Sequence, residues 1–389
     1  MDLTLTTEEQ EVRKWVRTFV DKEVRPLEHT VLERERRHEI GLRPDELKEL
    51  QNMAKSAGFF GVQTPEKYGG MELGAVMSAL IETEIGRTFV PFRFGGHADN
   101  ILYYANDQQK DTYLVHTING DRKSCFGITE PGAGSDAKQI RTRAVRDGDD
   151  WVINGEKTFI SSGHDADFCM VFAVTDPGKG ADGGVTCFLV DREMGWTSSP
   201  IDTMGEWGPA SLTFDNVRVP HANILGEEGH GFDLAMQWIG RGRYMIPARS
   251  IGACERLLDM AMEHARTRVT FGKPIADRQA IQWMIADSAV EVEALRWLVL
   301  VAAWQVDQGM DSRHAQSMAK LFGGIKANEV VDRVMQIHGG MGYTRELPVE
   351  RWYRELRLTR IYEGTDEMQR RTISRNLLKG YARVQGHLG

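Results

Sequence analysis

The chain has few cysteines, four in 389 residues, and they are scattered along it. They form no C-x-x-C pair and no grouping with histidine that would hold a metal, so structural thiols in a reducing compartment and no metal site are expected. These residues are Cys125, Cys169, Cys187 and Cys254. No apolar run approaches the roughly 20 residues that span a bilayer, and the N-terminus has no signal-peptide core. The sequence therefore predicts a cytoplasmic protein without a membrane partner, although a processed protein of an organelle matrix would look the same.

An excess of positive charge is also absent. The formal net charge is -8 and the isoelectric point is about 5.8. A nucleic-acid surface needs clustered lysine and arginine, so nucleic acid is not expected as a partner. An anionic small molecule stays compatible with this charge, because a pocket needs only a few local cations.

Length and composition predict two or three globular domains, because 389 residues exceed what one small core organises. Residues 1–120 are predicted to form an N-terminal α-helical domain. Residues 121–230 are rich in glycine and short β-type runs, which predicts a middle β domain. Residues 231–389 are predicted to form a C-terminal bundle of long helices. The fold class is therefore α+β, in the order helical, β, helical.

Local signals mark the expected elements. Thr7 and Gln10 form a predicted capping box at the first helix, which Pro26 ends or kinks. Further helices are predicted over 44–57, 74–85, 232–266, 277–308, 312–337 and 365–379. The β-type runs are 151–153, 168–174, 185–190, 212–214 and 217–219, with turn signals at Asn154-Gly155 and at 182–184.

The segment 361–365, Ile-Tyr-Glu-Gly-Thr, carries the strongest functional signal. Thr365 is a predicted N-cap, and the two acids that follow it favour the helix dipole. Glu363 precedes this cap, on a loop that Gly364 opens to an incoming substrate. Beside Tyr362 in an apolar pocket, desolvation would raise the pKa of Glu363, as a general base near neutral pH requires. The alternative is an exposed acid next to a cap.

Three further segments are candidates for the same site. The glycine-rich loop 129–136 offers amides and hydroxyls that bind phosphate or ring atoms, and a tight turn is the alternative. It follows neither the G-x-G-x-x-G nor the Walker pattern, which excludes a Rossmann or P-loop site. In segment 266–275, Arg268 would hold a pyrophosphate or complement a helix dipole. Segment 336–343 has three glycines where a helix C-cap needs one, which indicates a ligand against bare backbone, whereas His338 is more often structural.

Four motifs, in this order and at these separations, resemble the acyl-CoA dehydrogenase family of flavoproteins. They are Thr129–Asp136, Arg268–Lys273, Gln336–Tyr343 and Ile361–Thr365. The resemblance covers essentially the whole chain, including Asn106–Lys110. It implies an N-terminal helical domain, a middle β-barrel domain and a C-terminal four-helix bundle, usually assembled as a homotetramer. FAD would lie between the β domain and the bundle, with part of its site supplied by a neighbouring subunit.

The resemblance, carried over position by position, implies two sets of FAD contacts. Those of the β domain are Phe126, Ile128, Thr129, Ser135, Phe159 and Ser161. Those of the bundle are Arg268, Thr270, Phe271, Gln279, Gln336, Gly339, Gly340, Thr365 and Glu367. The implied substrate contacts are Ser135, Arg243, Tyr362 and Gly364.

Glu363 falls on the catalytic-base position of the commoner branch of this family. Another branch carries its base at the position of Gly242, so that alternative base is absent here. Arg243 is expected to act as a charge partner of the carboxylate rather than as a catalyst. The chain departs from the family at Phe159, where an indole is common, and at Phe126, where many relatives have tyrosine. Loop 204–211 also differs, so no contact is carried over there.

The implied reaction is α,β-dehydrogenation of an acyl-CoA thioester to the trans-2-enoyl-CoA, as in fatty-acid β-oxidation. Glu363 would remove the pro-R α proton while the β hydride leaves for flavin N5. The Glu363 backbone N–H and a ribityl hydroxyl of FAD would stabilise the charge on the thioester oxygen. An electron-transferring flavoprotein would then accept the electrons. The acyl cavity is expected along 95–104, beside Tyr362 and Trp238.

Two groups of alternatives remain open. The first is other flavin chemistry on the same scaffold, namely an acyl-CoA oxidase, a desulfinase or a monooxygenase. Oxidases tend to carry an extra C-terminal domain, and the other two usually lack the base, so Glu363 argues against them. The second is a non-catalytic subunit or a nucleic-acid-binding relative. The presence of Arg268, Gln336 and Glu363 argues against a non-catalytic subunit, and the net charge of -8 argues against DNA binding.

Overall fold

The computed structural model describes residues 5–206 and 208–383. The chain divides into two compact units. The helical unit comprises the chain up to Phe59, Leu73–Arg93 and the part from Gly242 onward. The sheet unit comprises Phe60–Glu72 and Phe94–Arg241. The α+β class with helical N- and C-terminal parts and a curled middle sheet is confirmed, whereas the domain boundaries at 120 and 230 stay predictions.

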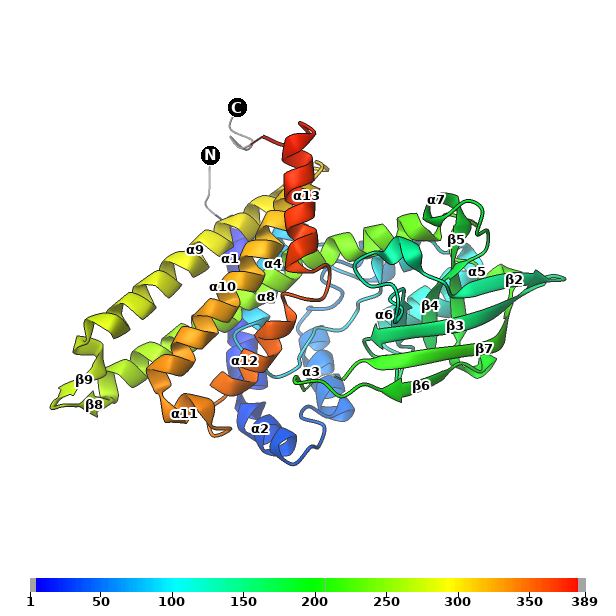
Figure 1. The fold of residues 1–389 in the computed structure, drawn as a ribbon. Coiled ribbons are helices and arrows are strands. Elements are labelled where there is room, and N and C mark those ends of the chain that lie inside the picture. The colour runs from blue at the N-terminus through cyan, green and yellow to red at the C-terminus, as the bar shows by residue number, and fades with distance from the viewer. Residues whose placement is uncertain (1–4, 207, 384–389) are drawn as a thin grey trace. The chain divides into compact units, whose positions relative to one another are not determined.

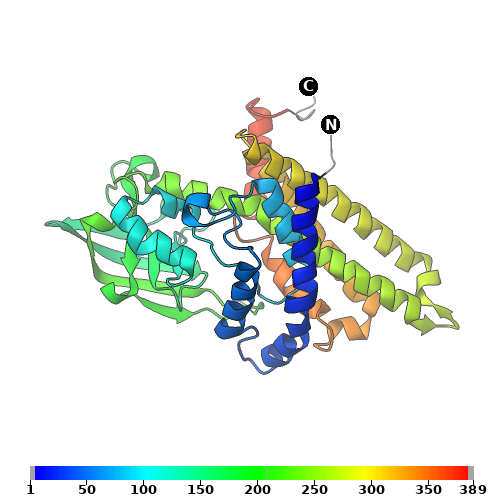
Figure 2. The ribbon, with the colours of Figure 1, turned by 180° about the vertical axis from the view of Figure 1, so that it is seen from behind.

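Three of the first four helices lie where the sequence predicts them, and the helix over residues 28–36 was not predicted. The four helices are α1 (Thr7–Phe19), α2 (Glu28–Arg36), α3 (Pro44–Ser56) and α4 (Ala75–Ile85), and α1 packs against α4 on the side seen in Figure 2. The predicted capping box is wrong by one residue. The Thr6 side chain accepts from the Glu9 amide, and the Glu9 carboxylate accepts from the Thr6 amide at 2.8 Å. A carboxylate is the stronger acceptor, so the helix begins at the Thr6–Glu9 pair and not at Thr7–Gln10.

The C-terminal helices are α8 (Gly231–Thr267), α9 (Gln279–Asp307), α10 (Arg313–His338), α12 (Val349–Leu358) and α13 (Asp366–Leu378). Figure 1 shows α8, α9 and α10 running alongside one another, with the hairpin of β8 (Val269–Thr270) and β9 (Lys273–Pro274) between α8 and α9. Helix α8 packs closely on α4, since a Cβ at Gly252 would collide with the Thr83 carbonyl oxygen. Helix α12 was not predicted from the sequence.

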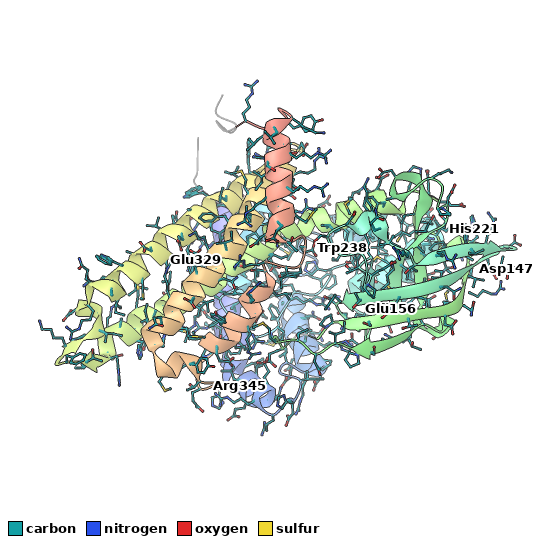
Figure 3. The ribbon with its side chains drawn as sticks, viewed as in Figure 1. Asp147, Glu156, His221, Trp238, Glu329 and Arg345 are labelled. Carbon is teal, nitrogen blue, oxygen red and sulfur yellow. The ribbon has the colours of Figure 1, made fainter. Side chains whose placement is uncertain are left out.

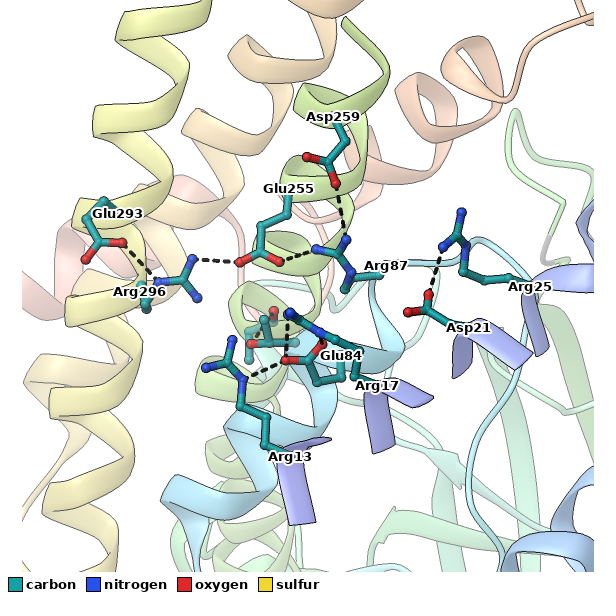
Figure 4. Close-up of polar contacts among 12 residues, drawn as sticks. Arg13, Arg17, Asp21, Arg25, Glu84, Arg87, Glu255, Asp259, Glu293 and Arg296 are labelled. Carbon is teal, nitrogen blue, oxygen red and sulfur yellow. Dashed lines mark hydrogen bonds and ion pairs between the residues drawn. The ribbon is translucent and has the colours of Figure 1, made fainter. Parts of the chain in front are cut away.

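Buried ion pairs join the helices of this unit (Figure 4). Glu84 of α4 is fully buried and accepts from the Nε atoms of Arg13 and Arg17 of α1, each at 2.7 Å. Glu255 of α8 lies between Arg87 and Arg296, at 2.6 and 2.7 Å. A buried charge that loses its partner is costly, so these pairs favour the packed arrangement. Glu84 links α4 to α1, and Glu255 links α8 to α9 and to the segment after α4.

The sheet unit contains one seven-stranded sheet of order β1-β4-β2-β3-β7-β6, with β5 paired to β4. The strands are β1 (Ser124–Gly127), β2 (Arg143–Asp147), β3 (Asp150–Ile160), β4 (Phe168–Val174), β5 (Val185–Asp191), β6 (Thr197–Pro200) and β7 (Ala210–Pro220). Alternate residues of β4 enter different apolar clusters, Phe168 one and Cys169 the other. The sheet is therefore covered on both faces, which explains the unbroken apolar sequence of β4.

One predicted turn is wrong. Asn154-Gly155 lies inside β3, where the pairing with β7 shifts by one residue. Asn216 is the extra residue of β7, with φ of 51°, so the runs 212–214 and 217–219 form one bulged strand. Gly155 is required because a Cβ there would lie 2.5 Å from Thr142 Oγ1. The signal at 182–184 does connect β4 to β5, through the short α7 (Ala181–Gly184).

Within the described ranges, every helix is too short or too weakly apolar to cross a membrane. The same residues contain no group of three or more His, Cys, Asp or Glu side chains arranged to hold a metal ion.

Candidate active site

The loop that carries Glu363 joins α12 to α13. Thr365 is the N-cap of α13, as predicted, and its hydroxyl accepts from the Met368 amide at 3.3 Å. Glu363 has a φ of 54°, in the left-handed region that non-glycine residues seldom adopt. A residue whose backbone is held in this conformation requires strong support from its surroundings, as is common at functional sites.

Two buried side chains provide this support. Lys320 of α10 is 1% exposed, and its Nζ donates to the Gly364 carbonyl oxygen at 2.7 Å. Gln369 of α13 is also 1% exposed, and its Nε2 donates to the Gly364 oxygen at 3.0 Å and to the Glu363 oxygen at 3.3 Å. Gly364 has a φ of 91°, and a Cβ there would lie 2.6 Å from the Gln369 amide nitrogen. The loop backbone therefore requires glycine at this position.

The Glu363 carboxylate is withdrawn from water. Its Oε2 atom is buried and has no hydrogen-bond partner among the described residues. Burial raises the pKa of Glu363 from 4.5 to about 7, while the positive charges of Arg243 and Lys320 lower it. Glu363 is therefore suited to accept a proton near neutral pH. The expected desolvated carboxylate is present, and its role as the base stays a prediction.

Gly242 of α8 lies directly against this carboxylate. A Cβ at Gly242 would be 2.9 Å from Glu363 Cδ and 3.1 Å from Oε2. A side chain at 242 and the Glu363 side chain would thus compete for the same space. The absence of a side chain at Gly242 leaves this space to Glu363.

Arg243 follows Gly242 and lies half-buried. It makes no ion pair with Glu363, and its buried Nε has no partner in the described part of the chain. Burial lowers the pKa of Arg243, and the charge of Glu363 raises it. The two charges therefore act on each other through space, and the role of Arg243 as a charge partner stays a prediction. Tyr362, beside Glu363, keeps 40% of its surface exposed.

The remaining candidates of the bundle gather at the far end of α8 and α10. The rings of His264 and His338 stack at 4.6 Å, which brings these helix ends together. Arg268 and Phe271 lie in or next to the hairpin after α8, and Phe271 is 98% exposed. Thr270, Gln279, Gln336, Gly339 and Gly340 lie in the hairpin, at the start of α9 and at the end of α10.

Within one chain, the candidate FAD contacts of the C-terminal helices do not all lie together. Thr365 and Glu367 lie next to Gly364, which Lys320 contacts. Gln336 follows Lys320 by 16 residues on α10, about 24 Å along the helix axis at 1.5 Å per residue. The Arg268 group and the Thr365 group are therefore separate surfaces of one molecule.

The candidates of the sheet unit surround a buried ion pair. Glu130 and Ala133 exchange two backbone hydrogen bonds, so the tight turn of the glycine-rich loop is real. Lys157 of β3 is fully buried, and its Nζ binds Glu130 Oε1 at 2.8 Å. The Thr158 amide donates to the Thr129 oxygen at 2.9 Å. This pair fixes the loop on β3, with Ser135 exposed beyond it and Ile128 buried before it.

Phe159 is turned outward by a bulge. Lys157 pairs with Leu212 and Ile160 with Ala210, so β3 has one residue more than β7. Phe159 has a φ of 56° and is 63% exposed. A bulge of this kind changes the direction of a side chain, and here it turns the Phe159 ring toward solvent. Ser161 follows it and is also exposed.

Phe126 and Trp238 stack at 4.0 Å, with 9° between their planes. The Trp238 indole, labelled in Figure 3, donates to Asp99 Oδ1 at 2.7 Å, and the Ser124 hydroxyl donates to Asp99 Oδ2. Asp99 was not predicted as a site residue from the sequence. Of the altered loop 204–211, Trp207 lies outside the described residues.

Sequence reasoning missed Lys320 and Gln369. Lys320 lies on the buried face of α10, which also contains many apolar residues, whereas Gln369 is one of two buried residues, both polar, of the mostly polar helix α13. The available signal was a lysine on the apolar face of α10, between the buried Ala319 and Gly323. A charged side chain at such a position requires a specific partner.

Comparison with known proteins gives a consistent result. The models for the N-terminal, middle and C-terminal domains of acyl-CoA dehydrogenase match residues 6–121, 125–217 and 229–378. An acyl-CoA dehydrogenase of Bacillus subtilis is 37% identical, over 97% of this chain and 99% of that protein. The caffeyl-CoA reductase-Etf complex subunit CarC of Acetobacterium woodii is 37% identical, over 95% and 97%. The solved butyryl-CoA dehydrogenase of Megasphaera elsdenii has a TM-score of 0.86 and 33% identity, over 97% and 100%.

Proposed function

Because the chain belongs to the acyl-CoA dehydrogenase family, we propose that it oxidises an acyl-CoA thioester to the trans-2-enoyl-CoA with Glu363 as the base. The chain is a member of a family of oxidoreductases that use FAD. The observation that carries the proposal is the buried Glu363 Oε2, which has no hydrogen-bond partner among the described residues and belongs to a carboxylate whose pKa is about 7.

Proton removal from the α-carbon falls to Glu363. An α proton of a thioester is too weakly acidic for a carboxylate in water, so the charge that develops on the thioester oxygen must be stabilised. The Glu363 backbone N–H donates to no other described residue and is free for this oxygen. Its unusual φ is held by Lys320 and Gln369, which keeps the carboxylate and this N–H on one rigid loop.

The residues present fit FAD. In the helical unit, the backbone at Gly339 and Gly340 is exposed, with open space where a Cβ would stand. Arg268 is exposed and forms no ion pair within the described residues, so its charge is available to a phosphate. In the sheet unit, Phe159 offers a ring face beside the exposed Ser161. When bound, FAD accepts the hydride from the β-carbon and passes the electrons on.

A homo-oligomer, with the homotetramer as the specific expectation, is part of this proposal. Lys320, which contacts the loop before Thr365, and Gln336, at the end of α10 near the Arg268 group, are about 24 Å apart along the helix, so we expect two chains to supply the two groups to one FAD. Helix α9 supports an assembly, because Trp283, Trp297 and Trp304 keep 60%, 40% and 46% of their surfaces exposed. Exposed aromatic side chains in a row are typical of an interface.

We further propose an electron-transferring flavoprotein as the electron acceptor. The name of the Acetobacterium woodii relative places that protein in a complex with such a flavoprotein. The same name gives a second candidate function, reduction of an α,β-unsaturated acyl-CoA, in which Glu363 returns the proton to the α-carbon. Comparing the rate of acyl-CoA oxidation with the rate of enoyl-CoA reduction by the pre-reduced enzyme distinguishes the two. A cytoplasmic location stays a prediction.

Glu363→Gln tests the role of the base. The variant is expected to keep bound FAD and to lose bleaching of the flavin by acyl-CoA by about a thousandfold or more, because no group is left to accept the proton. Stopped-flow absorbance with a panel of fatty, branched, aromatic and steroid acyl-CoAs measures this and identifies the acyl group. Glu11→Gln, an exposed acid of α1, is the matched control. Full bleaching by Glu363→Gln would remove Glu363 from this role.

A further inference from the structure

We propose that Lys320 is a positioning residue that fixes the loop of Glu363 and supplies a buried positive charge that favours the ionised form of its carboxylate. This inference rests on the proposed function, since it concerns the base of that reaction. Lys320 does not touch substrate in this proposal and acts through Glu363.

The setting of Lys320 is unusual for a lysine. It is the eighth residue of the 26-residue helix α10, is 1% exposed and forms no ion pair within 4 Å among the described residues. Its Nζ bonds the Gly364 carbonyl oxygen at 2.7 Å. Burial of an ammonium group is costly unless it is paired, and a neutral amide would hold one carbonyl at lower cost. The positive charge therefore has a use beyond this hydrogen bond.

The charged groups around Lys320 indicate this use. Burial lowers the pKa of Lys320 to about 8, so it is still mostly protonated near neutral pH, while Asp366 and Glu363 raise that pKa. Asp366 Oδ2 is already bound by Arg360 at 2.7 Å. Glu363 has no such partner, so Lys320 stabilises its charge without covering the oxygen that takes the proton.

Other charges face Glu363 and Lys320 as well. Arg243 of α8 lowers the pKa of Glu363 more than Lys320 does, and it opposes the charge of Lys320. Glu367 acts on Lys320 from α13, and Tyr362 adjoins Glu363 in the loop. Two cations from two helices thus flank one carboxylate. Arg243 is expected to remain in every variant described below and to leave part of the effect in place.

A comparison with Gln369 distinguishes the two roles of Lys320, which are the anchoring of the loop and the supply of a positive charge. Both side chains donate to the same Gly364 oxygen, at 3.0 and 2.7 Å, but Gln369 is neutral. Gln369→Met removes an anchor without a charge. Lys320→Gln removes the charge and keeps an amide that can reach toward the carbonyl, and Lys320→Met removes both.

The test is the pH dependence of flavin bleaching by acyl-CoA in single turnovers. Bleaching needs ionised Glu363, so the rate falls at acid pH. Both Lys320→Gln and Lys320→Met are expected to move the midpoint of this fall to higher pH by about one unit, because an opposite charge close to a carboxylate lowers its pKa by such amounts. Gln369→Met is expected to lower the rate without moving the midpoint. Lys320→Arg is expected to restore the wild-type midpoint.

The inference is overturned if the midpoint of Lys320→Gln coincides with that of the wild type. It is equally overturned if Gln369→Met moves the midpoint as far as Lys320→Gln does, because the shift then comes from the backbone anchor. If Lys320→Met does not fold, Lys320→Gln and Gln369→Met still decide. Wild-type protein that fails to bleach at every pH contradicts the proposed function instead, and Glu363→Gln measured alongside keeps these failures apart.

Discussion

Glu363 illustrates at the scale of one residue how a raised pKa affects both reactivity and stability. In the folded protein its pKa is about 7, above the ordinary value of 4.5. The folded state therefore binds the proton more tightly than the unfolded state, and the free energy of unfolding falls as pH rises from about 4.5 to 7. The same desolvation that prepares the carboxylate as a base makes its ionised form costly for the fold.

Glu363→Gln should therefore stabilise the protein in a pH-dependent way. Relative to the wild type, its free energy of unfolding is expected to rise by roughly 2 kcal/mol between pH 5 and pH 7.5, since glutamine carries no charge at either pH. Denaturant unfolding of FAD-saturated protein at the two pH values measures the difference. Lys320, whose pKa burial lowers to about 8, is mostly protonated at both pH values. A difference between the variants that is the same at both pH values would contradict the raised pKa.

At the scale of the element, the glycine-rich loop depends on a strand that is remote in sequence. Lys157 of β3 and Glu130 of the loop are both buried, and Glu130 also accepts from the amides of Arg141 and Thr142, at 2.6 and 2.9 Å. The loop that carries Ser135 is thus anchored through one carboxylate. An anchored loop presents its backbone to a ligand without first having to become ordered.

Lys157→Met is expected to destabilise the protein by about 3–5 kcal/mol, because Glu130 would be left buried without its cation. FAD is expected to bind at least about tenfold more weakly, since the loop loses its anchor. The double variant Lys157→Met/Glu130→Gln should recover part of the stability, because the unpaired charge is gone. Thermal unfolding and titration of apoprotein with FAD measure both effects. Equal destabilisation in the single and double variants would argue against the ion pair as the cause.

Elements also depend on caps that only packing supplies. The first amides of α4 have no capping side chain at Gly74 and instead donate to Asp307 of α9, from Ala75 at 2.5 Å and Val76 at 2.9 Å. The end of the same helix was predictable from Gly86, which is the C-cap of α4. Start and end of one helix therefore differ in how far local sequence determines them.

At the scale of the whole molecule, the outer face of α9 remains without a partner within the described chain. Trp283, Val290, Trp297 and Trp304 recur every seven residues and lie on one exposed face. Val290 is 69% exposed. A surface of this composition is more apolar than a monomer in water normally shows, which favours contact with another chain.

Val290→Glu is expected to shift the protein to smaller assemblies and to weaken FAD binding, because it places a charge in the proposed apolar interface, which would bring the two FAD surfaces together. Val145→Glu is the matched control, an exposed valine on β2 that is 59% exposed. Light scattering coupled to size exclusion, with the flavin-to-protein absorbance ratio, measures both effects. An unchanged assembly in Val290→Glu would contradict an interface on α9.

The sequence by itself determined the family, the order of the elements and the Thr365 cap next to Glu363, because each rests on motifs of a few neighbouring residues. Local signals failed at Asn154-Gly155 and at the first capping box, since the same short patterns fit a bulge and a cap one residue earlier. Only the tertiary structure brought Lys320 and Gln369 to the loop, and Gly242 against Glu363, because these contacts join residues far apart in the chain. The raised pKa of Glu363 likewise required the fold, since burial is a property of packing.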